Sequence, residues 1–135
     1  MKAKLFIIAV LFTFFLCCIC GCSGKPDASG IWKGKAVFTD TDLWTKKVKK
    51  GNDTIELMLA QSDKNINGKI TVNNQAIQID SGFIIDNKIS LKAGPINIEA
   101  TINGSNLDGT IKSEYRGEYG IGSVHKLEGT LKLTK

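Results

Sequence analysis

The feature that most constrains this chain is a period-two alternation of apolar and polar residues that begins at Ile31. Gly, Asn or Asp residues interrupt the alternation at short intervals, and no stretch keeps a helical period of 3.6 residues. The pattern therefore predicts an all-β domain of eight strands, over residues 31–39, 54–61, 65–73, 75–86, 88–93, 96–103, 106–114 and 123–133.

The breaks between these strands carry residues that suit tight hairpin turns, because Asn, Asp and Gly tolerate positive φ and Pro fixes φ. They are Asp63-Lys64-Asn65, Asn73-Asn74, Asp86-Asn87, Gly94-Pro95 and Asn103-Gly104-Ser105. Strands joined in this way are antiparallel neighbours, so the sequence predicts an up-and-down meander. Eight such strands form either a sandwich or a closed barrel, and we favour the barrel because closure removes both edge strands.

The first strand opens with Gly30-Ile31-Trp32. This tripeptide resembles the Gly-x-Trp start of lipocalin-like and avidin-like barrels, which are often grouped as calycins. The resemblance covers the tripeptide and the number of strands, and it implies a calycin-type small β-barrel. It names no ligand, since neither a second lipocalin motif nor a set of biotin-contacting residues is present.

Alternation also predicts which side chains face the interior. Trp32 is expected to be a structural residue, with its indole lying over inward glycines that leave room for it. The predicted inward positions are Trp32, Gly34, Ala36, Phe38, Ile55, Leu57, Leu59, Ile66, Gly68, Ile70, Val72, Ile77, Ile79, Ser81, Phe83, Ile85, Ile89, Leu91, Ile96, Ile98, Ala100, Ile102, Leu107, Gly109, Ile111, Ser113, His125, Leu127, Gly129, Leu131 and Leu133.

The two ends of the predicted barrel differ. The two long connections, residues 40–53 and 115–122, are the first and the seventh, so they lie at the same end of a meander. Only tight turns lie at the other end, where the chain enters the first strand. Binding residues tend to lie on long loops held by a rigid scaffold, so we expect function at the long-loop end, facing away from any N-terminal tether.

The first 22 residues predict that tether. Lys2 and Lys4 precede an apolar run of 16 residues, Leu5–Cys20, and Ile19-Cys20-Gly21-Cys22 follows at its end. The run is shorter than the roughly 20 residues of a membrane-spanning helix, which favours a removable signal. The last four residues resemble the lipobox of bacterial lipoproteins, and this resemblance implies cleavage before Cys22 and lipidation of that cysteine. An ordinary secretory signal cut nearby and an uncleaved anchor are the alternatives.

The resulting division is a signal peptide over residues 1–21, a lipidated cysteine with a short linker over 22–29, and a β-barrel over 30–135. The lipoprotein resemblance implies an exported protein of the cell envelope, held at the cell membrane or the outer membrane. Ser23 favours the outer membrane where the host has one, under the sorting rule known for some enteric bacteria. Removing Lys2 and Lys4 lowers the formal net charge from +5 to +3, which is too small an excess for a nucleic-acid binder.

Four predicted inward residues near the long-loop end are polar, namely Asp40, Ser113, Tyr115 and His125. They come from the first, seventh and eighth strands, which are neighbours in a closed barrel. One interpretation is a polar collar over an apolar pocket, as in small-ligand sites. The other is that these groups satisfy one another or lie in water at the rim.

The long connections hold a second set of candidates, Trp44, Lys46, Lys47, Arg116 and Tyr119. Aromatic and arginine side chains suit contacts with proteins, and exposed lysines suit anionic partners. A solvated loop with Trp44 capping the barrel explains the same residues. Asp40, Asp42 and Asp53 lack the spacing of a calcium loop, and no catalytic or cofactor motif is present.

Two hypotheses follow. The first is a non-enzymatic, lipid-anchored barrel that needs no metal or cofactor and binds a small apolar or amphipathic molecule at its long-loop end. The alternative is a protein-interaction module, an accessory or inhibitor lipoprotein, whose barrel is fully packed and whose loops contact an envelope protein. A cavity of about 300 Å³ or more behind the polar collar favours the first.

Overall fold

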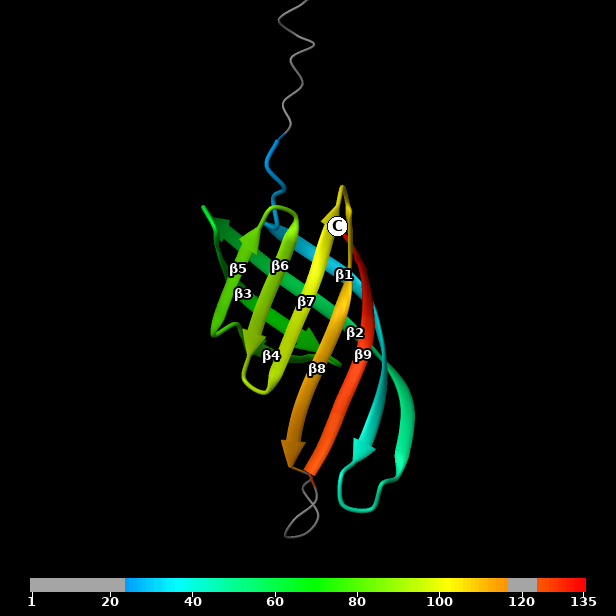
Figure 1. The fold of residues 1–135 in the computed structure, drawn as a ribbon. Coiled ribbons are helices and arrows are strands. Elements are labelled where there is room, and N and C mark those ends of the chain that lie inside the picture. The colour runs from blue at the N-terminus through cyan, green and yellow to red at the C-terminus, as the bar shows by residue number, and fades with distance from the viewer. Residues whose placement is uncertain (1–23, 117–123) are drawn as a thin grey trace, which may run out of the picture.

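The structure, a computed structural model, describes residues 24–116 and 124–135, and these residues form an all-β fold (Figure 1). The predicted signal peptide, Cys22 and Tyr119 lie outside the described residues. The strands are β1 (Gly30–Asp42), β2 (Val48–Ser62), β3 (Asn65–Val72), β4 (Gln75–Gln78), β5 (Ser81–Ile85), β6 (Lys88–Ala93), β7 (Ile96–Asn103), β8 (Asn106–Arg116) and β9 (Val124–Thr134). No helix that could cross a membrane occurs in these two ranges.

All strand pairings are antiparallel, and eight of the nine strands form a continuous ring. The last strand pairs with the first, with Gly34 opposite Leu133. The ring then runs through β2, β3, β5, β6, β7 and β8 back to β9. The prediction of an all-β antiparallel meander is confirmed, and the ring is compatible with a small β-barrel.

The number of strands was predicted wrongly, because residues 75–86 form two strands and not one. The break lies at Ile79 and Asp80, where the chain changes partners. The amide of Ile79 donates to the carbonyl of Gly68 in β3 at 2.9 Å, and the amide of Asp80 donates to the carbonyl of Lys92 in β6 at 2.8 Å. β4 therefore pairs only with β3, while β5 pairs mainly with β6.

The break also shifts the alternation, so three predicted inward residues are exposed. Ser81, Phe83 and Ile85 lie on the outside, and Ile84 is buried in their place. Elsewhere alternation locates the core well. The buried core includes Trp32, Ile55, Leu57, Ile66, Ile70, Ile89, Ile98, Leu107, Leu131 and Leu133.

The predicted long first connection, 40–53, is also wrong. β1 continues to Asp42 and β2 already begins at Val48, so the two strands form one long hairpin with a short turn. Cross-strand pairing continues to Thr41 opposite Val48. The polar start of β2, which is rich in Lys, Asp, Asn and Gly, is thus held in a strand by its pairing with β1. In the seventh connection, β8 continues to Arg116, and residues 117–123 lie outside the described residues.

The predicted turns agree with the backbone. Asp63, Asn73, Asn74 and Asp86 have φ of 55°, 47°, 69° and 55°, values that Asn and Asp tolerate better than most residues. The chain enters the ring at the end of the β2–β3 turn, where the amide of Ala28 donates to Gln61 Oε1 at 2.8 Å. We call this the entry end, and the opposite end, with the β1–β2 turn, the mouth end.

Trp32 is fully buried at the entry end. Its indole N–H donates to the carbonyl of Ala28 at 2.8 Å. The inward glycines serve a different purpose from the one expected. A Cβ at Gly34 or Gly68 would lie 2.0 or 1.9 Å from a carbonyl oxygen of the adjacent strand, and Trp32 is not among the nearest atoms. These glycines therefore allow neighbouring strands to approach closely.

Candidate functional site

The strands around the ring have unequal lengths, and this opens the mouth end on one side. β1, β2, β8 and β9 extend well past the hairpin of β6 and β7, whose strands stop at Ala93 and start at Ile96 (Figure 1). Ile96 is opposite Ser113 in β8, so the last residues of β8 have no partner in β7. The long strands form a high wall, and the β6–β7 hairpin forms a low one.

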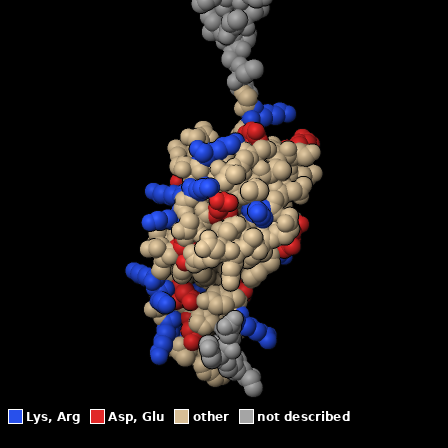
Figure 2. All heavy atoms as spheres, turned by 180° about the vertical axis from the view of Figure 1, so that it is seen from behind, with Lys and Arg blue, Asp and Glu red and all other residues tan. Residues whose placement is uncertain are grey.

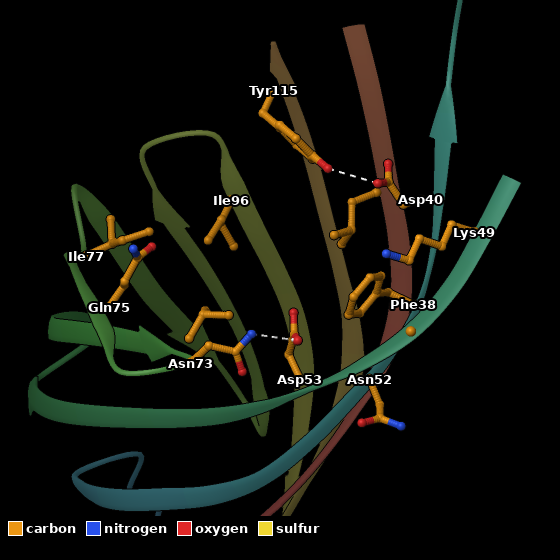
Figure 3. Close-up of a pocket in the computed structure, with 13 residues that line it drawn as sticks. Phe38, Asp40, Lys49, Asn52, Asp53, Asn73, Gln75, Ile77, Ile96 and Tyr115 are labelled. Carbon is orange, nitrogen blue, oxygen red and sulfur yellow. Dashed lines mark hydrogen bonds between the residues drawn. The ribbon is translucent and has the colours of Figure 1, made fainter. Parts of the chain in front are cut away.

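A cavity of about 610 Å³ lies between these walls (Figure 3). The high wall contributes Phe38, Asp40, Lys49, Gly51, Asn52, Asp53, Tyr115 and Leu127, and the facing side contributes Val72, Asn73, Gln75, Ile77 and Ile96. The Lys49 side chain points into the cavity, whereas Asn52 points away from it (Figure 3). The lining therefore combines charged, amide and apolar groups.

The floor of the cavity is mainly apolar. A smaller void of about 80 Å³ adjoins it and shares the lining residues Phe38, Asp53, Val72, Ile96 and Leu127 with the main cavity. Ala36, Ile55 and Ile111, all buried, complete this void together with Ser113. A polar opening thus leads to a base in which apolar side chains predominate.

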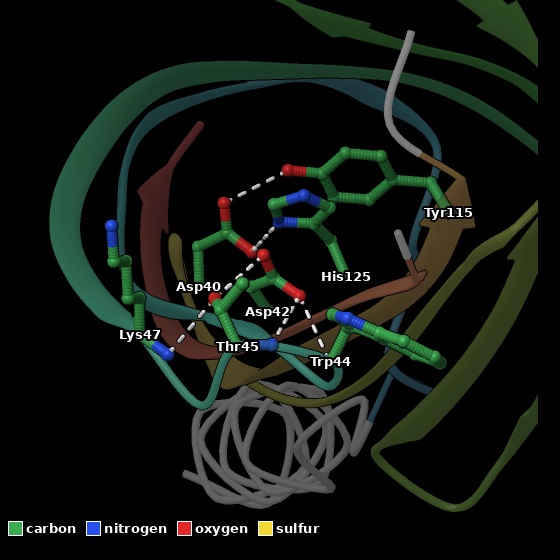
Figure 4. Close-up of polar contacts among 7 residues, drawn as sticks. All are labelled: Asp40, Asp42, Trp44, Thr45, Lys47, Tyr115 and His125. Carbon is green, nitrogen blue, oxygen red and sulfur yellow. Dashed lines mark hydrogen bonds and ion pairs between the residues drawn. The ribbon is translucent and has the colours of Figure 1, made fainter. Parts of the chain in front are cut away.

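Three of the four predicted collar residues contact one another around Asp40 (Figure 4). The Tyr115 hydroxyl donates to Asp40 Oδ2 at 2.9 Å, and His125 Nδ1 lies 3.1 Å from Asp40 Oδ1. The rings of Tyr115 and His125 are stacked, with centroids 5.1 Å apart. Ser113 is buried and lines the smaller void.

The members of this collar have different relations to the cavity. Asp40 and Tyr115 line it, whereas His125 does not and contacts Asp40 from behind. Burial of the phenol raises the pKa of Tyr115 from 10.0 to about 12, and the hydrogen bond to Asp40 and the charge of that carboxylate act in the same direction. Tyr115 is therefore a neutral hydrogen-bonding group at the mouth over the ordinary pH range.

Asp40, Tyr115 and His125 satisfy one another, which agrees with the second interpretation for these three residues. The two interpretations are compatible, because an internally bonded rim also fixes the side chains that a ligand would contact. Within the described residues the His125 ring is hydrogen-bonded to Asp40, and Asp40 also accepts the hydrogen bond from the Tyr115 hydroxyl. No three His, Cys, Asp or Glu side chains in the same residues are placed to hold a metal ion.

The second set of predicted residues lies at the turn of the β1–β2 hairpin and at the end of β8. Trp44 is 81% exposed and does not cap the ring. Lys46, Lys47 and Arg116 are also exposed. Asp42 holds the turn, because Oδ1 accepts hydrogen bonds from the amides of Trp44 and Thr45 and Oδ2 accepts one from the Thr45 hydroxyl (Figure 4).

The same contacts affect the charge of the turn. The Thr45 hydroxyl, followed by the amides of Thr45 and Trp44, lowers the pKa of Asp42 below its ordinary value of 3.8. Asp42 is therefore a carboxylate at neutral pH, and it acts as a structural acceptor within the turn.

Sequence reasoning predicted Val72, Ile77 and Ile96 as inward residues but assigned no site to them, and it missed Asn73, Gln75 and the inward Lys49. Asn73, Gln75, Ile77 and Ile96 reach the cavity because the ring is low on their side. Asp53 accepts a hydrogen bond of 2.7 Å from the side-chain amide of Asn73, and this bond joins β2 to the β3–β4 turn (Figure 3). Extending the alternation backward from Ile55 through Asp53 and Gly51 places Lys49 on the inner face, so the sequence does carry a signal for this residue.

Comparisons with protein-family models and with curated proteins found no match to this chain.

Proposed function

We propose that this chain is a lipid-anchored, non-enzymatic protein of the cell envelope that binds a small amphipathic molecule in the cavity at its mouth end. The cavity carries the proposal. Its volume of about 610 Å³ falls within the usual range of small-molecule sites, roughly 300–1,000 Å³.

The lining supports an amphipathic ligand. The base formed by Ala36, Ile55 and Ile111 suits an apolar tail. Nearer the opening, Lys49, Asp40 and Tyr115 offer charge and hydrogen bonds to a polar head. The ring of strands and the Gly30-Ile31-Trp32 start further support a calycin-like binding barrel.

The tether is proposed from the sequence. Cys22 follows the apolar run and stands in a lipobox-like sequence, eight residues before β1 begins at Gly30. Lipidation there would hold the entry end close to the membrane. Several acyl chains on one cysteine would make the attachment effectively permanent.

The experiment is native mass spectrometry of the full chain, extracted in mild detergent from the envelope of its own host. We expect an additional mass that leaves on denaturation. Ile96→Trp, which fills the cavity, should abolish that mass. Ile85→Trp is the matched control, since Ile85 is 58% exposed on the outside of β5, and it should retain the mass.

A second candidate function, the protein-interaction module, is favoured by one observation, the 81% exposure of Trp44 on a hydrogen-bonded turn. If the chain is a protein-interaction module, the wild-type chain should carry no additional mass. Crosslinks from positions next to Trp44 then recover one defined envelope protein. This pair of results would exclude the ligand-binding proposal.

A further inference from the structure

Exposed apolar side chains are concentrated on one hairpin. Six of the nine large apolar side chains that are exposed in the described residues belong to β1, β2 or the turn between them. They are Ile31, Val37, Leu43, Trp44, Val48 and Met58. A soluble surface tolerates scattered apolar residues, but a concentration on one element indicates a contact surface.

The strand register places Ile31, Val37, Val48 and Met58 on the outer face of the hairpin, and Leu43 and Trp44 follow in its turn. Trp32 and Ala36 face the core, so Ile31 and Val37 face outward. Ile31 is opposite Met58 at the entry end, and Thr41 is opposite Val48 near the turn. The exposed apolar residues therefore extend along the hairpin from the entry end to Trp44.

The same face is cationic. Lys33, Lys35 and Lys50 alternate with inward residues, and Lys46 and Lys47 lie in or beside the turn, all five of them exposed. Figure 2 shows Lys and Arg side chains following the long side of the molecule on which β1 and β2 lie. The five lysines and the six apolar residues together are called the hairpin face below.

Three of the four carboxylates in residues 30–62 are directed away from this face. Asp40 and Asp53 line the cavity on the inner side, and Asp42 is engaged within the turn. Glu56 is the outward carboxylate of the two strands, and its Oε2 lies 3.3 Å from Lys33 Nζ. The hairpin face therefore carries five lysines and one carboxylate, Glu56, which is paired with Lys33.

Hydrogen bonds hold the backbone of the turn that carries Trp44. Besides the contacts of Asp42, the amide of Lys46 donates to the carbonyl of Asp42 at 2.8 Å, and the amide of Leu43 donates to the carbonyl of Val124 in β9 at 2.8 Å. The exposed indole is therefore attached to a hydrogen-bonded turn. A surface that is ordered before binding loses less conformational entropy when it binds.

We propose that the hairpin face docks on an anionic lipid surface. Trp suits the boundary between headgroups and acyl chains, and lysine suits anionic headgroups. The cores of protein interfaces are depleted of lysine, so the composition favours lipid over a protein partner. The chain enters this face at Gly30, and therefore a membrane-attached N-terminus and the hairpin face can contact the same bilayer.

This proposal replaces the expected upright orientation. That orientation assigned the lysines to a loop at the far end of the domain. Because β1 and β2 are long strands, the lysines extend along the side of the domain, and the ring would lie with the hairpin face against the membrane. The inference does not depend on a ligand in the cavity, so either proposal can fail alone.

The experiment reconstitutes the full chain into vesicles of phosphatidylcholine alone or mixed with phosphatidylglycerol, each with or without brominated acyl chains. Trp44 is the reporter, because Trp32 is fully buried and supplies a constant background. We expect brominated lipid to quench Trp44 only when phosphatidylglycerol is present. Raising the salt concentration should reverse the quenching, because the attraction to anionic lipid is screened.

The matched variants carry the same change of charge on different faces. Lys35→Glu/Lys47→Glu/Lys50→Glu alters the hairpin face, and Lys88→Glu/Lys92→Glu/Lys112→Glu alters exposed positions on β6 and β8. A lysine near an anionic surface contributes about fivefold in binding, so the first variant should lower the docked population by about a hundredfold or more. The second should retain most of it.

Trp32 emission reports whether each variant is folded. Quenching that is independent of phosphatidylglycerol, or equal losses in both variants, would overturn the proposal. Trp44 that stays accessible to an aqueous quencher until a protein partner is added would overturn it as well, and would favour the interaction module.

Discussion

Tyr115 and His125 face each other across β8 and β9, with their rings stacked at an interplanar angle of 14° and both side chains bonded to Asp40. Asp40 lies 75 positions before Tyr115 in the chain, so this cluster forms only when the first and last strands pair. The cluster therefore links closure of the ring to the shape of the mouth.

Replacing Asp40 tests this link through the titration of Tyr115. In Asp40→Asn the pKa of Tyr115 should fall from about 12 but remain above 10.0, because burial, the largest cause of the shift, is retained. Tyrosinate absorbance measures it, in a Tyr119→Phe background that leaves one tyrosine. Asp42→Asn is the control, since Asp42 bonds to the turn and not to Tyr115. An unchanged titration in Asp40→Asn would contradict the geometry.

The same shift predicts alkaline sensitivity. The folded state favours the neutral phenol, so Tyr115 contributes stability that is complete below a pH of about 10 and is lost as the pH rises toward about 12. Thermal unfolding of Tyr115→Phe should therefore depend less on pH in this window than that of the wild type. If the two proteins lose stability in parallel, the tyrosine is not responsible.

The two tryptophans should differ sharply in their effect on stability. Trp32 is fully buried and hydrogen-bonded to Ala28, so Trp32→Ala should lower the free energy of unfolding by about 3–5 kcal/mol. Trp44 is 81% exposed, so Trp44→Ala should change it by no more than about 0.5 kcal/mol. Denaturant unfolding measures both, and similar losses would show that the assignment of core and surface is wrong.

Gly34 should resist substitution because of ring closure. A Cβ at this position would lie 2.0 Å from the carbonyl oxygen of Lys132 in β9, and therefore the backbones must separate. Gly34→Ala should lower the free energy of unfolding by about 1–3 kcal/mol. Gly24→Ala, where no atom lies within 4 Å of the added Cβ, should leave it unchanged. A wild-type midpoint for Gly34→Ala would contradict the close approach of β1 and β9.

Lipidation can be tested at a single atom. Cys22→Ala should abolish incorporation of labelled fatty acid, because Cys22 is the cysteine preceded by a small residue, Gly21, in the lipobox-like sequence. Cys20→Ala keeps that site and should be labelled normally. Label that persists in Cys22→Ala would exclude this attachment.

Much of the fold could be predicted because the alternation is strict over most strands. β6 and β7 have the bounds that the sequence predicts, and β8 and β9 differ by only a few residues at their ends. The break at Ile79 and Asp80 could not be predicted. Both backbone amides remain hydrogen-bonded, but the amide of Ile79 donates to β3 and the amide of Asp80 donates to β6. Local pattern carries no information about which neighbour a strand chooses.

The site was predictable in part for the same reason. Asp40, Tyr115 and His125 could be placed together because they share an inward face on strands that closure makes adjacent. The facing wall with Gln75 and Ile77 depends on how far β6 and β7 fall short of their neighbours. That difference in length is a property of the whole ring. The prediction also assigned the polar part of the β1–β2 hairpin to a loop, because its composition is typical of loops.

The junction between β3 and β5 has the shortest ladder of the ring. Asn65 and Phe83 pair there, and the amide of Ile84 donates to the carbonyl of Lys64, whereas every other junction of the ring is a longer ladder. Separating β3 from β5 breaks few hydrogen bonds. We therefore expect the ring to open first at this junction, as a curled sheet opens along its edge. This junction runs from the entry end, while the longest ladders, β1–β2 and β8–β9, hold the mouth. The high wall of the cavity is thus built on the longest ladders, and slow amide exchange should be concentrated in those strands.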